Sequence, residues 1–286
     1  MARTLQSGTG HMRSIKSSQL AQESDVRYRQ YCTQACLLGL VRKHSLDDAC
    51  PNVSAYRTDG AGNHHVLGQK SVAKLVLSQL AADPDNGCKP LRNQGARGTL
   101  FRLILESYGY TFVAKGTVIV FKAKLKYEGS VYRYLDKVQG ELIPVYLGNI
   151  SLVRPYFVDV GVKTVHMLLI SWAGEQASKD LVQAMGRDLT AETNWAVTKL
   201  LSCGVKYCDV RPPNVLWNTE IRNVLLVDFE CSEILKQAPV LQETSPNRKQ
   251  KHLHFNLDLS CRSFSDGLFI NPSKRFDKNN PCFGSL

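Results

Sequence analysis

The apolar residues in the first ninety positions repeat with the spacing of helices. The segment from Asp25 to about Leu40 reads as one helix, and Ser71–Ala82 reads as a second that ends at Asp83-Pro84. One face of the second helix would carry Val72, Leu75, Val76 and Leu80. Residues 1–24 are polar and rich in Ser, Gln and Arg. We therefore expect a disordered N-terminus over 1–24 and a helical N-terminal extension over 25–90.

The pattern changes near residue 90, where β-branched and aromatic residues become frequent. Such residues fit strands, and 3.6-residue periodicity fits helices. The expected strands are Thr99–Leu105, Tyr110–Phe121, Ile143–Val153, Val162–Ser171, Val215–Trp217 and Asn223–Phe229. The expected helices are Lys122–Val138 and Glu192–Leu201. Helices, a β-rich block and a second helical block in this order predict an α+β chain with segregated parts.

Charge and apolar content restrict the function classes. The 286 residues carry a net charge of +11, which favours an anionic partner such as a nucleotide, a nucleic acid or an acidic protein. A nucleic-acid partner is not favoured, because the chain shows neither an RNP sequence nor a zinc finger. We expect no membrane partner, since every apolar run is shorter than a span needs. The N-terminus lacks a signal-peptide pattern, which predicts an intracellular protein, cytoplasmic or nuclear.

Two further features leave alternatives open. Residues 246–286 read as a basic, flexible tail, and its Arg248, Lys249 and Lys251 fit a nuclear import signal or simply solvated charge. The nine cysteines do not suggest a disulfide framework in an intracellular chain. Cys32, Cys36 and Cys50, with His44 between the last two, come nearest to a metal pattern. Their spacing is looser than that of paired zinc ligands, and apolar neighbours favour buried structural thiols.

The chemistry-bearing residues lie between positions 204 and 230. Asp209 is followed five residues later by Asn214, and Asp228 ends an apolar strand fourteen residues beyond. Phosphoryl transfer needs a carboxylate at the attacking hydroxyl and oxygen ligands that hold magnesium. Neither spacing is specific alone, but the ordered combination resembles the catalytic loop and metal-binding motif of protein kinases. The resemblance places Asp209 as catalytic base, with Asn214 and Asp228 as metal ligands for Mg²⁺.

The same resemblance implies an ATP-binding set further upstream. The strand Phe112–Lys115 matches the kinase lysine strand, so Lys115 would contact the nucleotide phosphates. Glu128, thirteen residues later, would be its ion-pair partner, with Glu141 as the weaker alternative. The glycines Gly95 and Gly98 fit either a phosphate-covering loop or an ordinary turn.

Two more positions follow from the kinase resemblance. The segment Leu168–Glu175 lies where the hinge between lobes would offer its backbone to adenine. Arg211 lies where kinases often carry a lysine near the transferred phosphoryl group, so it would stabilise charge there or anchor the loop.

More closely, the chain is similar to fungal kinase-like proteins of unassigned substrate over roughly residues 30–250. Segments that carry this likeness begin at Tyr31, Cys50, Tyr108, Asp209 and Asp228. The resemblance implies a two-lobed protein-kinase-like fold, with a β-rich N-lobe over 91–174 and a shortened helical C-lobe over 175–245. It also implies ATP and Mg²⁺ as cofactors.

Departures from the kinase pattern leave two functions open. Tyr207 replaces the catalytic-loop histidine, and Glu230 replaces the glycine after Asp228-Phe229, which predicts a fixed metal-binding loop. No Ala-Pro-Glu motif follows, and 56 residues remain after Glu230. The first reading is a phosphotransferase that transfers the γ-phosphoryl of ATP to a protein Ser/Thr or small-molecule hydroxyl. The second is a pseudokinase that binds nucleotide or protein partners.

Overall fold

The computed structural model describes residues 29–57, 62–95, 98–158 and 161–235 as a mixed α+β structure. The expected disordered N-terminus 1–24 and basic tail 246–286, including the cluster at Arg248, lie outside these residues. Among the described residues, no helix is both long and apolar enough to cross a membrane.

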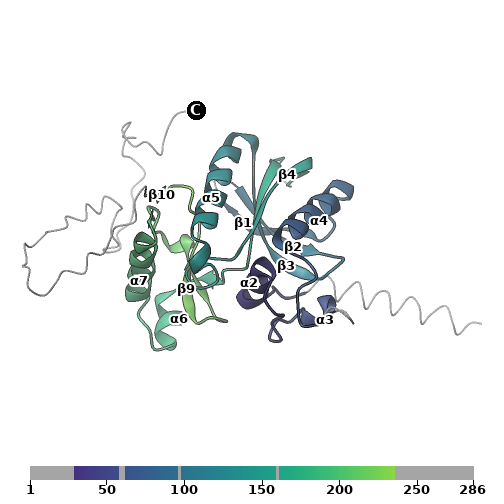
Figure 1. Ribbon diagram of the computed structural model, residues 1–286. Helices are drawn as coiled ribbons and strands as arrows, with labels where there is room; N and C mark the ends of the chain where they lie inside the picture. The colour runs from purple at the N-terminus through teal and green to yellow at the C-terminus, as the bar shows by residue number, and fades with distance from the viewer. Residues whose placement is uncertain (1–28, 58–61, 96–97, 159–160, 236–286) are drawn as a thin grey trace, which may run out of the picture.

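A five-stranded antiparallel sheet organises the first two thirds of the described chain (Figure 1). Its spatial order is β1-β2-β3-β5-β4. The strands are β1 (Cys88–Gly95), β2 (Gly98–Leu105), β3 (Tyr110–Thr117), β4 (Tyr146–Phe157) and β5 (Lys163–Ile170). The central strand β3 pairs Lys115 with Leu100 on one side and with Leu168 on the other.

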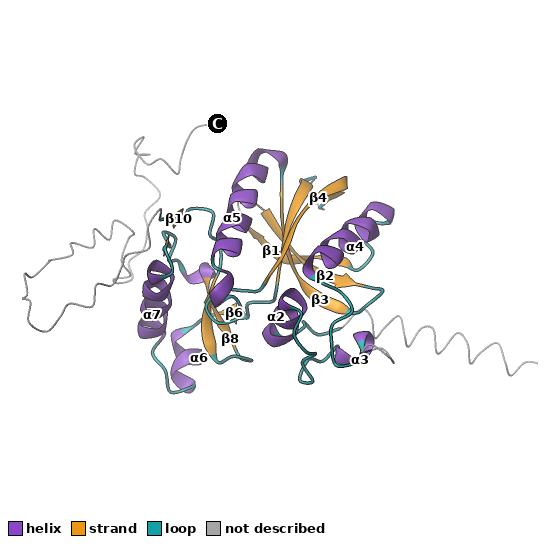
Figure 2. Cartoon of the chain, viewed as in Figure 1, coloured by secondary structure: helices purple, strands orange, loops and turns teal. Residues whose placement is uncertain are grey.

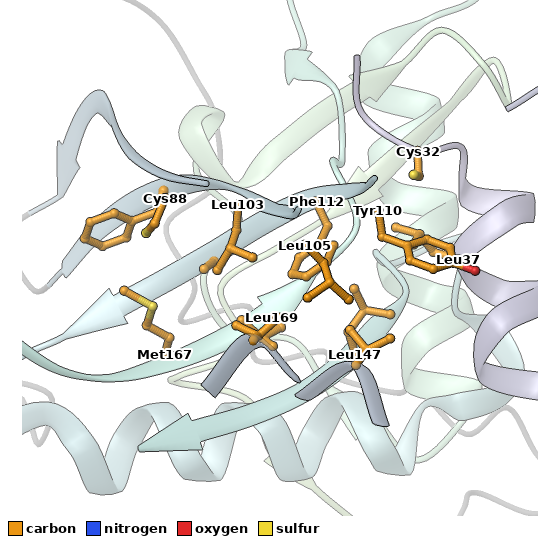
Figure 3. Close-up of a cluster of buried hydrophobic side chains, with 14 of the residues drawn as sticks. Cys32, Leu37, Cys88, Leu103, Leu105, Tyr110, Phe112, Leu147, Met167 and Leu169 are labelled. Carbon is orange, nitrogen blue, oxygen red and sulfur yellow. The ribbon is translucent and has the colours of Figure 1, made fainter. Parts of the chain in front are cut away.

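One face of the sheet is covered by helices from the N-terminal part of the chain. These are α2 (Gln34–Arg42), α3 (Val53–Tyr56) and α4 (Gln69–Ala82). Leu103, Phe112 and Leu169 point to this face and join the α2 and α4 side chains in one buried cluster (Figure 3). Residues 29–90 are therefore built into the core of the sheet rather than attached to its surface.

The opposite face of the sheet packs against α5 (Lys122–Tyr134). Side chains of a strand alternate between faces, so Val113 and Lys115 lie opposite Phe112 and Ala114. Val113, Leu168 and Ile170 join Leu125 and Tyr132 of α5 in a second buried cluster. This cluster continues into the C-terminal elements, which lie together beyond the sheet (Figure 2).

The C-terminal elements are short strands and two helices. They comprise β6 (Glu175–Gln176), α6 (Lys179–Ala184), α7 (Leu189–Ser202), β7 (Val205–Lys206), β8 (Val215–Asn218), β9 (Asn223–Leu226) and β10 (Glu233–Ile234). Three 3₁₀ turns accompany the fold, η1 (Ile119–Phe121), η2 (Asp136–Val138) and η3 (Pro212–Asn214). Strand β8 pairs with β6 and β9, and β7 pairs with β10.

The sequence placed the start of the first helix too early. Of the expected helix from Asp25 to Leu40, residues 29–33 are not helical and residues 25–28 lie outside the described chain. The helix begins at Gln34 because the Thr33 hydroxyl accepts a hydrogen bond from the Cys36 backbone N–H at 3.0 Å. Cys32 therefore lies before the helix, and Cys36 lies in its first turn.

Several strand boundaries also differ from the expected ones. Strand β3 ends at Thr117, which pairs with Gly98 at the start of β2, rather than at Phe121. Strand β4 begins at Tyr146 rather than Ile143, although Leu142 and Ile143 are fully buried. Their apolar character reflects burial in a loop rather than strand pairing.

Candidate functional site

Lys115 lies between two carboxylates contributed by distant parts of the chain. Its Nζ is 2.7 Å from Glu128 Oε2 and 2.8 Å from Asp228 Oδ1. Burial by itself favours the neutral amine, but the two carboxylates outweigh it and raise the pKa of Lys115. The amine is therefore held as a cation at a fixed position on the face of β3 that meets α5. Glu141, the alternative partner, is not in this contact.

Glu128 is almost completely buried on α5, with 1% of its side chain exposed. Burial raises the pKa of Glu128, and the positive charge of Lys115 opposes that effect. The backbone N–H of Phe229 also donates a hydrogen bond to its carboxylate. Glu128 thus fixes Lys115 and the backbone after Asp228 at the same time.

Asp228 follows β9 in a left-handed backbone conformation, with φ at +65°. A non-glycine residue rarely adopts this conformation, which costs on the order of 1–3 kcal/mol and is common at functional sites. Although burial alone would raise it, the Lys115 charge lowers the pKa of Asp228. The carboxylate is therefore held in its ionised form.

The left-handed residue is Asp228 itself rather than the position of Glu230, where the kinase pattern has glycine. The Glu230 backbone N–H donates to the Asp228 carboxylate. Its side chain lies 3.5 Å from Lys124 Nζ. The replacement of glycine is thus accommodated by contacts from both ends of Glu230.

Asp209 and Asn214 lie on one short loop, as their spacing suggested. Asn214 Nδ2 donates to the Asp209 carbonyl at 3.1 Å and to its carboxylate Oδ2 at 3.0 Å. The Asn214 carbonyl accepts the Val227 N–H at 3.1 Å, which ties the loop to the residue before Asp228. The carboxylate and amide oxygens of Asp228 and Asn214 are the ligand types that Mg²⁺ prefers.

Arg211 forms a bidentate contact with Asp209. Its Nε and Nη2 each lie 2.5 Å from one oxygen of the Asp209 carboxylate. Sequence reasoning placed Arg211 near the reacting group or as a loop anchor, and in this structure it pairs with Asp209, two residues away in the same loop. Both oxygens of Asp209 consequently face a cation.

Four aromatic side chains beside the candidate residues form a chain of ring contacts. Sequence reasoning did not predict these contacts. Tyr207 contacts Phe229 with ring centroids 5.2 Å apart, Phe229 contacts Tyr132 at 5.0 Å, and Tyr132 stacks on Tyr146 at 6.0 Å. The Tyr207 hydroxyl donates to the Val227 carbonyl at 2.6 Å. Tyr207, at the position that the resemblance assigns to the catalytic-loop histidine, therefore has a structural role. The only sequence signal for Phe229, Tyr132 and Tyr146 was the apolar periodicity of their segments, which predicts burial but not which rings meet.

The expected hinge segment is covered by the chain that precedes α2. Tyr31 stacks on Trp172 with ring centroids 4.7 Å apart. Gln34 Nε2 donates to the Trp172 carbonyl at 2.6 Å, and Gln34 Oε1 accepts from the Ser171 hydroxyl at 2.5 Å. The Trp172 carbonyl, expected to be available to a ligand, is thus occupied by Gln34 and also accepts from Asn218 at 3.3 Å.

The two glycines of the candidate phosphate loop face each other across the turn between β1 and β2. Gly95 is the register partner of Gly98, and residues 96–97 lie outside the described chain. A Cβ on Gly98 would lie 2.3 Å from the Gly116 carbonyl oxygen. Close approach of the β2 and β3 backbones therefore explains Gly98 without a ligand.

The fold brings Cys32, Cys36 and Cys50 together. Their sulfur atoms all lie within 4.8 Å of one another, and all three side chains are buried. His44, which lies between the last two in sequence, is exposed and outside this group.

A surface pocket of about 380 Å³ lies away from the cysteines and from the Lys115 site, between α7 and the β8–β9 turn. It is lined by residues that include Arg187, Trp195 and Arg222.

Comparison with known proteins finds a curated relative. No protein-family model matches the chain. Over 230 residues, 40% of positions are identical to a protein of Podospora anserina that is named Meiotic driver SPOK2. The match covers 78% of this chain and 29% of that protein. The chain therefore spans less than a third of its relative's length.

Proposed function

We propose that this chain is an ATP- and Mg²⁺-dependent phosphotransferase module of the protein-kinase-like superfamily. The observation that carries the proposal is the contact of one lysine with two carboxylates, Glu128 and Asp228, which lie 13 and 113 positions away from Lys115. The kinase resemblance implies the Lys115–Glu128 pair and places Asp228 in the same site as a metal ligand. An accidental motif match would have no reason to bring them within hydrogen-bond distance.

In the proposed arrangement, the five-stranded sheet with α5 forms the upper lobe and the elements after Gly174 form the lower lobe. The candidate residues come from both sides of this division: Lys115 and Glu128 from the sheet side, and Asp209, Asn214 and Asp228 from the other. A nucleotide held between the lobes would meet all five side chains. The contribution of candidate residues from both groups of elements supports the kinase-like reading, in which the site lies between two lobes.

The donor set fits Mg²⁺–ATP. The Lys115 cation would bind phosphate oxygens, and Glu128 would keep its amine in place after Asp228 turns to the metal. Asp228 and Asn214 offer oxygen ligands, and bound magnesium would neutralise charge that develops on the phosphoryl group. Asp209 would orient the acceptor hydroxyl and accept its proton.

One observation favours the second candidate function, a nucleotide-binding pseudokinase. Arg211 contacts both carboxylate oxygens of Asp209, which occupies the group that would accept the proton. Turnover therefore requires Arg211 to leave Asp209 when substrate binds and to turn toward the phosphoryl group. If Arg211 stays in place, the module binds nucleotide without transferring phosphate.

The relative's name suggests a wider role for the module. Because the chain matches 29% of a protein named as a meiotic driver, we include in the proposal that it acts as one part of a larger protein of that kind. The phosphoryl acceptor would then be a molecule on which that larger protein acts.

Phosphate transfer from γ-labelled ATP tests the proposal. Transfer to water, to the chain itself or to a panel of hydroxyl compounds is measured with Mg²⁺ for the wild type, Asp209→Asn and the exposed-residue control Asp180→Asn. We expect wild type and the control to turn over, and Asp209→Asn to be slower by about 10²–10⁴-fold. If the wild-type protein binds ATP but transfers no phosphate, the phosphotransferase proposal is wrong and the pseudokinase is the better account.

A further inference from the structure

The three cysteines near the N-terminus meet although they come from three different local structures. Cys32 lies in the extended segment before α2, Cys36 in the first turn of α2, and Cys50 in the loop before α3. Their exposed fractions are 3%, 0% and 2%. A convergence of three sulfur atoms within 4.8 Å, sealed from solvent, goes beyond what packing of small apolar side chains requires.

Polar hydrogens point at these sulfur atoms from several directions. The Thr111 N–H and the Asn52 side-chain amide donate to Cys32 Sγ at 3.3 and 3.4 Å. The Tyr56 hydroxyl lies 2.8 Å from Cys36 Sγ. A neutral thiol is a weak acceptor, so donors gathered around buried sulfur suit thiolates that bind a metal ion.

Donors also reach the third sulfur. The Asn52 backbone N–H and the Tyr56 hydroxyl both form hydrogen bonds with Cys50. Buried thiolates that face one another need a cation between them, and the surrounding donors alone do not supply a full positive charge.

We propose that Cys32, Cys36 and Cys50 bind one zinc ion through their three sulfur atoms. Zinc–sulfur bonds of about 2.3 Å place tetrahedral sulfur ligands roughly 3.8 Å apart, so the present grouping needs a contraction of at most about 1 Å. The Tyr56 hydroxyl forms hydrogen bonds with two of the three sulfurs, those of Cys36 and Cys50, and would be the fourth ligand of the ion.

The ion would have a structural consequence for the segment that covers Trp172. Tyr31 and Gln34 contact Trp172, and Cys32 and Cys36 alternate with them along the same six residues. A zinc ion that binds both cysteines also fixes both contacts. The site thereby attaches the N-terminal segment to the backbone at Ser171 and Trp172, whether or not the module transfers phosphate.

Metal content of the purified chain tests the zinc site without reference to nucleotide. Protein prepared under reducing conditions should hold about one zinc ion per chain after dialysis against a weak chelator, as expected of a closed structural site. Cobalt(II) added to the zinc-depleted protein should give thiolate charge-transfer bands in the near ultraviolet. The variants Cys32→Ser and Cys50→Ser should lose at least about tenfold in metal affinity. Cys88→Ser, at a buried cysteine outside the group, should not.

A second measurement keeps the test decisive if the serine variants do not fold. X-ray absorption at the zinc edge of wild-type protein should give three sulfur neighbours at about 2.3 Å. A chain that holds neither zinc nor cobalt, or one whose zinc has fewer than three sulfur neighbours, would overturn the proposal. So would a disulfide between two of these cysteines that persists in the reducing preparation. None of these results depends on the phosphotransferase activity.

Discussion

At the scale of single residues, the candidate site depends on a charge balance around Lys115. One cation faces two carboxylates, of which Glu128 is buried and Asp228 is partly accessible. The arrangement carries a net negative charge, and the Asp228 carboxylate remains partly exposed to solvent. Both features suit the later entry of a divalent cation, which would take Asp228 from Lys115 and leave the Lys115–Glu128 pair intact.

Removing the cation should destabilise the fold. Lys115→Met leaves the Glu128 carboxylate buried beside Asp228, so we expect the free energy of unfolding to fall by about 2–4 kcal/mol in urea denaturation at neutral pH. The loss should shrink at acidic pH, where a proton neutralises Glu128. The double variant Lys115→Met/Glu128→Gln should recover part of the stability. A single variant as stable as wild type would show that the charges do not interact in solution.

His166 should make stability depend on pH. Burial, with a smaller effect of Lys122 and Lys126, lowers the pKa of His166 to about 4, against an unfolded value of roughly 6.5. Between these values the unfolded chain binds a proton that the folded chain does not. Stability should therefore fall as pH drops through this window, by up to about 3 kcal/mol in total.

Denaturation over a pH series measures that effect. His166→Gln, which has no titratable group at this position, should flatten the decline between about pH 6.5 and 4. An identical pH profile for wild type and His166→Gln would mean that His166 is protonated equally in the folded and unfolded chains.

Several residue contacts could be anticipated from the sequence and others could not. The pairing of Lys115 with Glu128 follows from a strand lysine and a helix glutamate at kinase-like spacing, so a motif encodes it. The bidentate contact of Arg211 with Asp209 depends on side-chain rotamers within one loop. The stacking of Tyr132 on Tyr146 depends on how a helix crosses a sheet. Neither geometry is written in local spacing.

At the scale of elements, the segment around α2 links distant parts of the chain. The Glu220 carboxylate, in the β8–β9 turn, accepts from the Gln34 backbone N–H, which lies 2.8 and 2.9 Å from its two oxygens, and from the Ala35 N–H at 3.4 Å. A carboxylate at this position satisfies unpaired donors of the first turn and complements the helix dipole. The start of α2 is thus determined in part by a residue 186 positions away.

Removal of this cap should cost stability. We expect Glu220→Ala to lower the free energy of unfolding by about 1–2 kcal/mol, because the N–H groups at the helix start lose a charged acceptor. Glu233→Ala is the matched control, since its exposed pair with Lys206 should contribute less than about 0.5 kcal/mol. Equal losses in the two variants, measured by denaturant titration, would argue against a capping role for Glu220.

Most helix and strand positions follow from the sequence, and the errors have a common cause. The helix at 69–82 and the strand at 215–218 match their apolar patterns closely, and the strand expected over 223–229 ends at Leu226. The predicted first helix began too early because its apolar periodicity does not show that Thr33 caps the helix. Ile143 was assigned to a strand because an apolar run was interpreted as strand pairing, whereas it reflects burial. In both places a long-range or side-chain contact decides the boundary, and periodicity does not record such contacts.

At the scale of the whole molecule, the two buried clusters share the five-stranded sheet. One lies between the sheet and the N-terminal helices, and the other continues from α5 into the C-terminal elements. The candidate residues from Lys115 to Asp228 lie on, or next to, strands and helices whose apolar side chains form the second cluster. A ligand bound there should therefore stabilise the described fold as a unit, by mass action.

Calorimetric titration with ATP, with and without Mg²⁺, tests the central claim most directly. The wild type and Asp180→Asn should bind ATP more tightly with magnesium than without it. Asp228→Ala should lose the magnesium dependence and at least about tenfold in affinity, because it lacks the proposed metal ligand. If the wild type binds no nucleotide under either condition, or if Asp228→Ala binds Mg²⁺–ATP as well as the wild type does, the proposed nucleotide site is wrong.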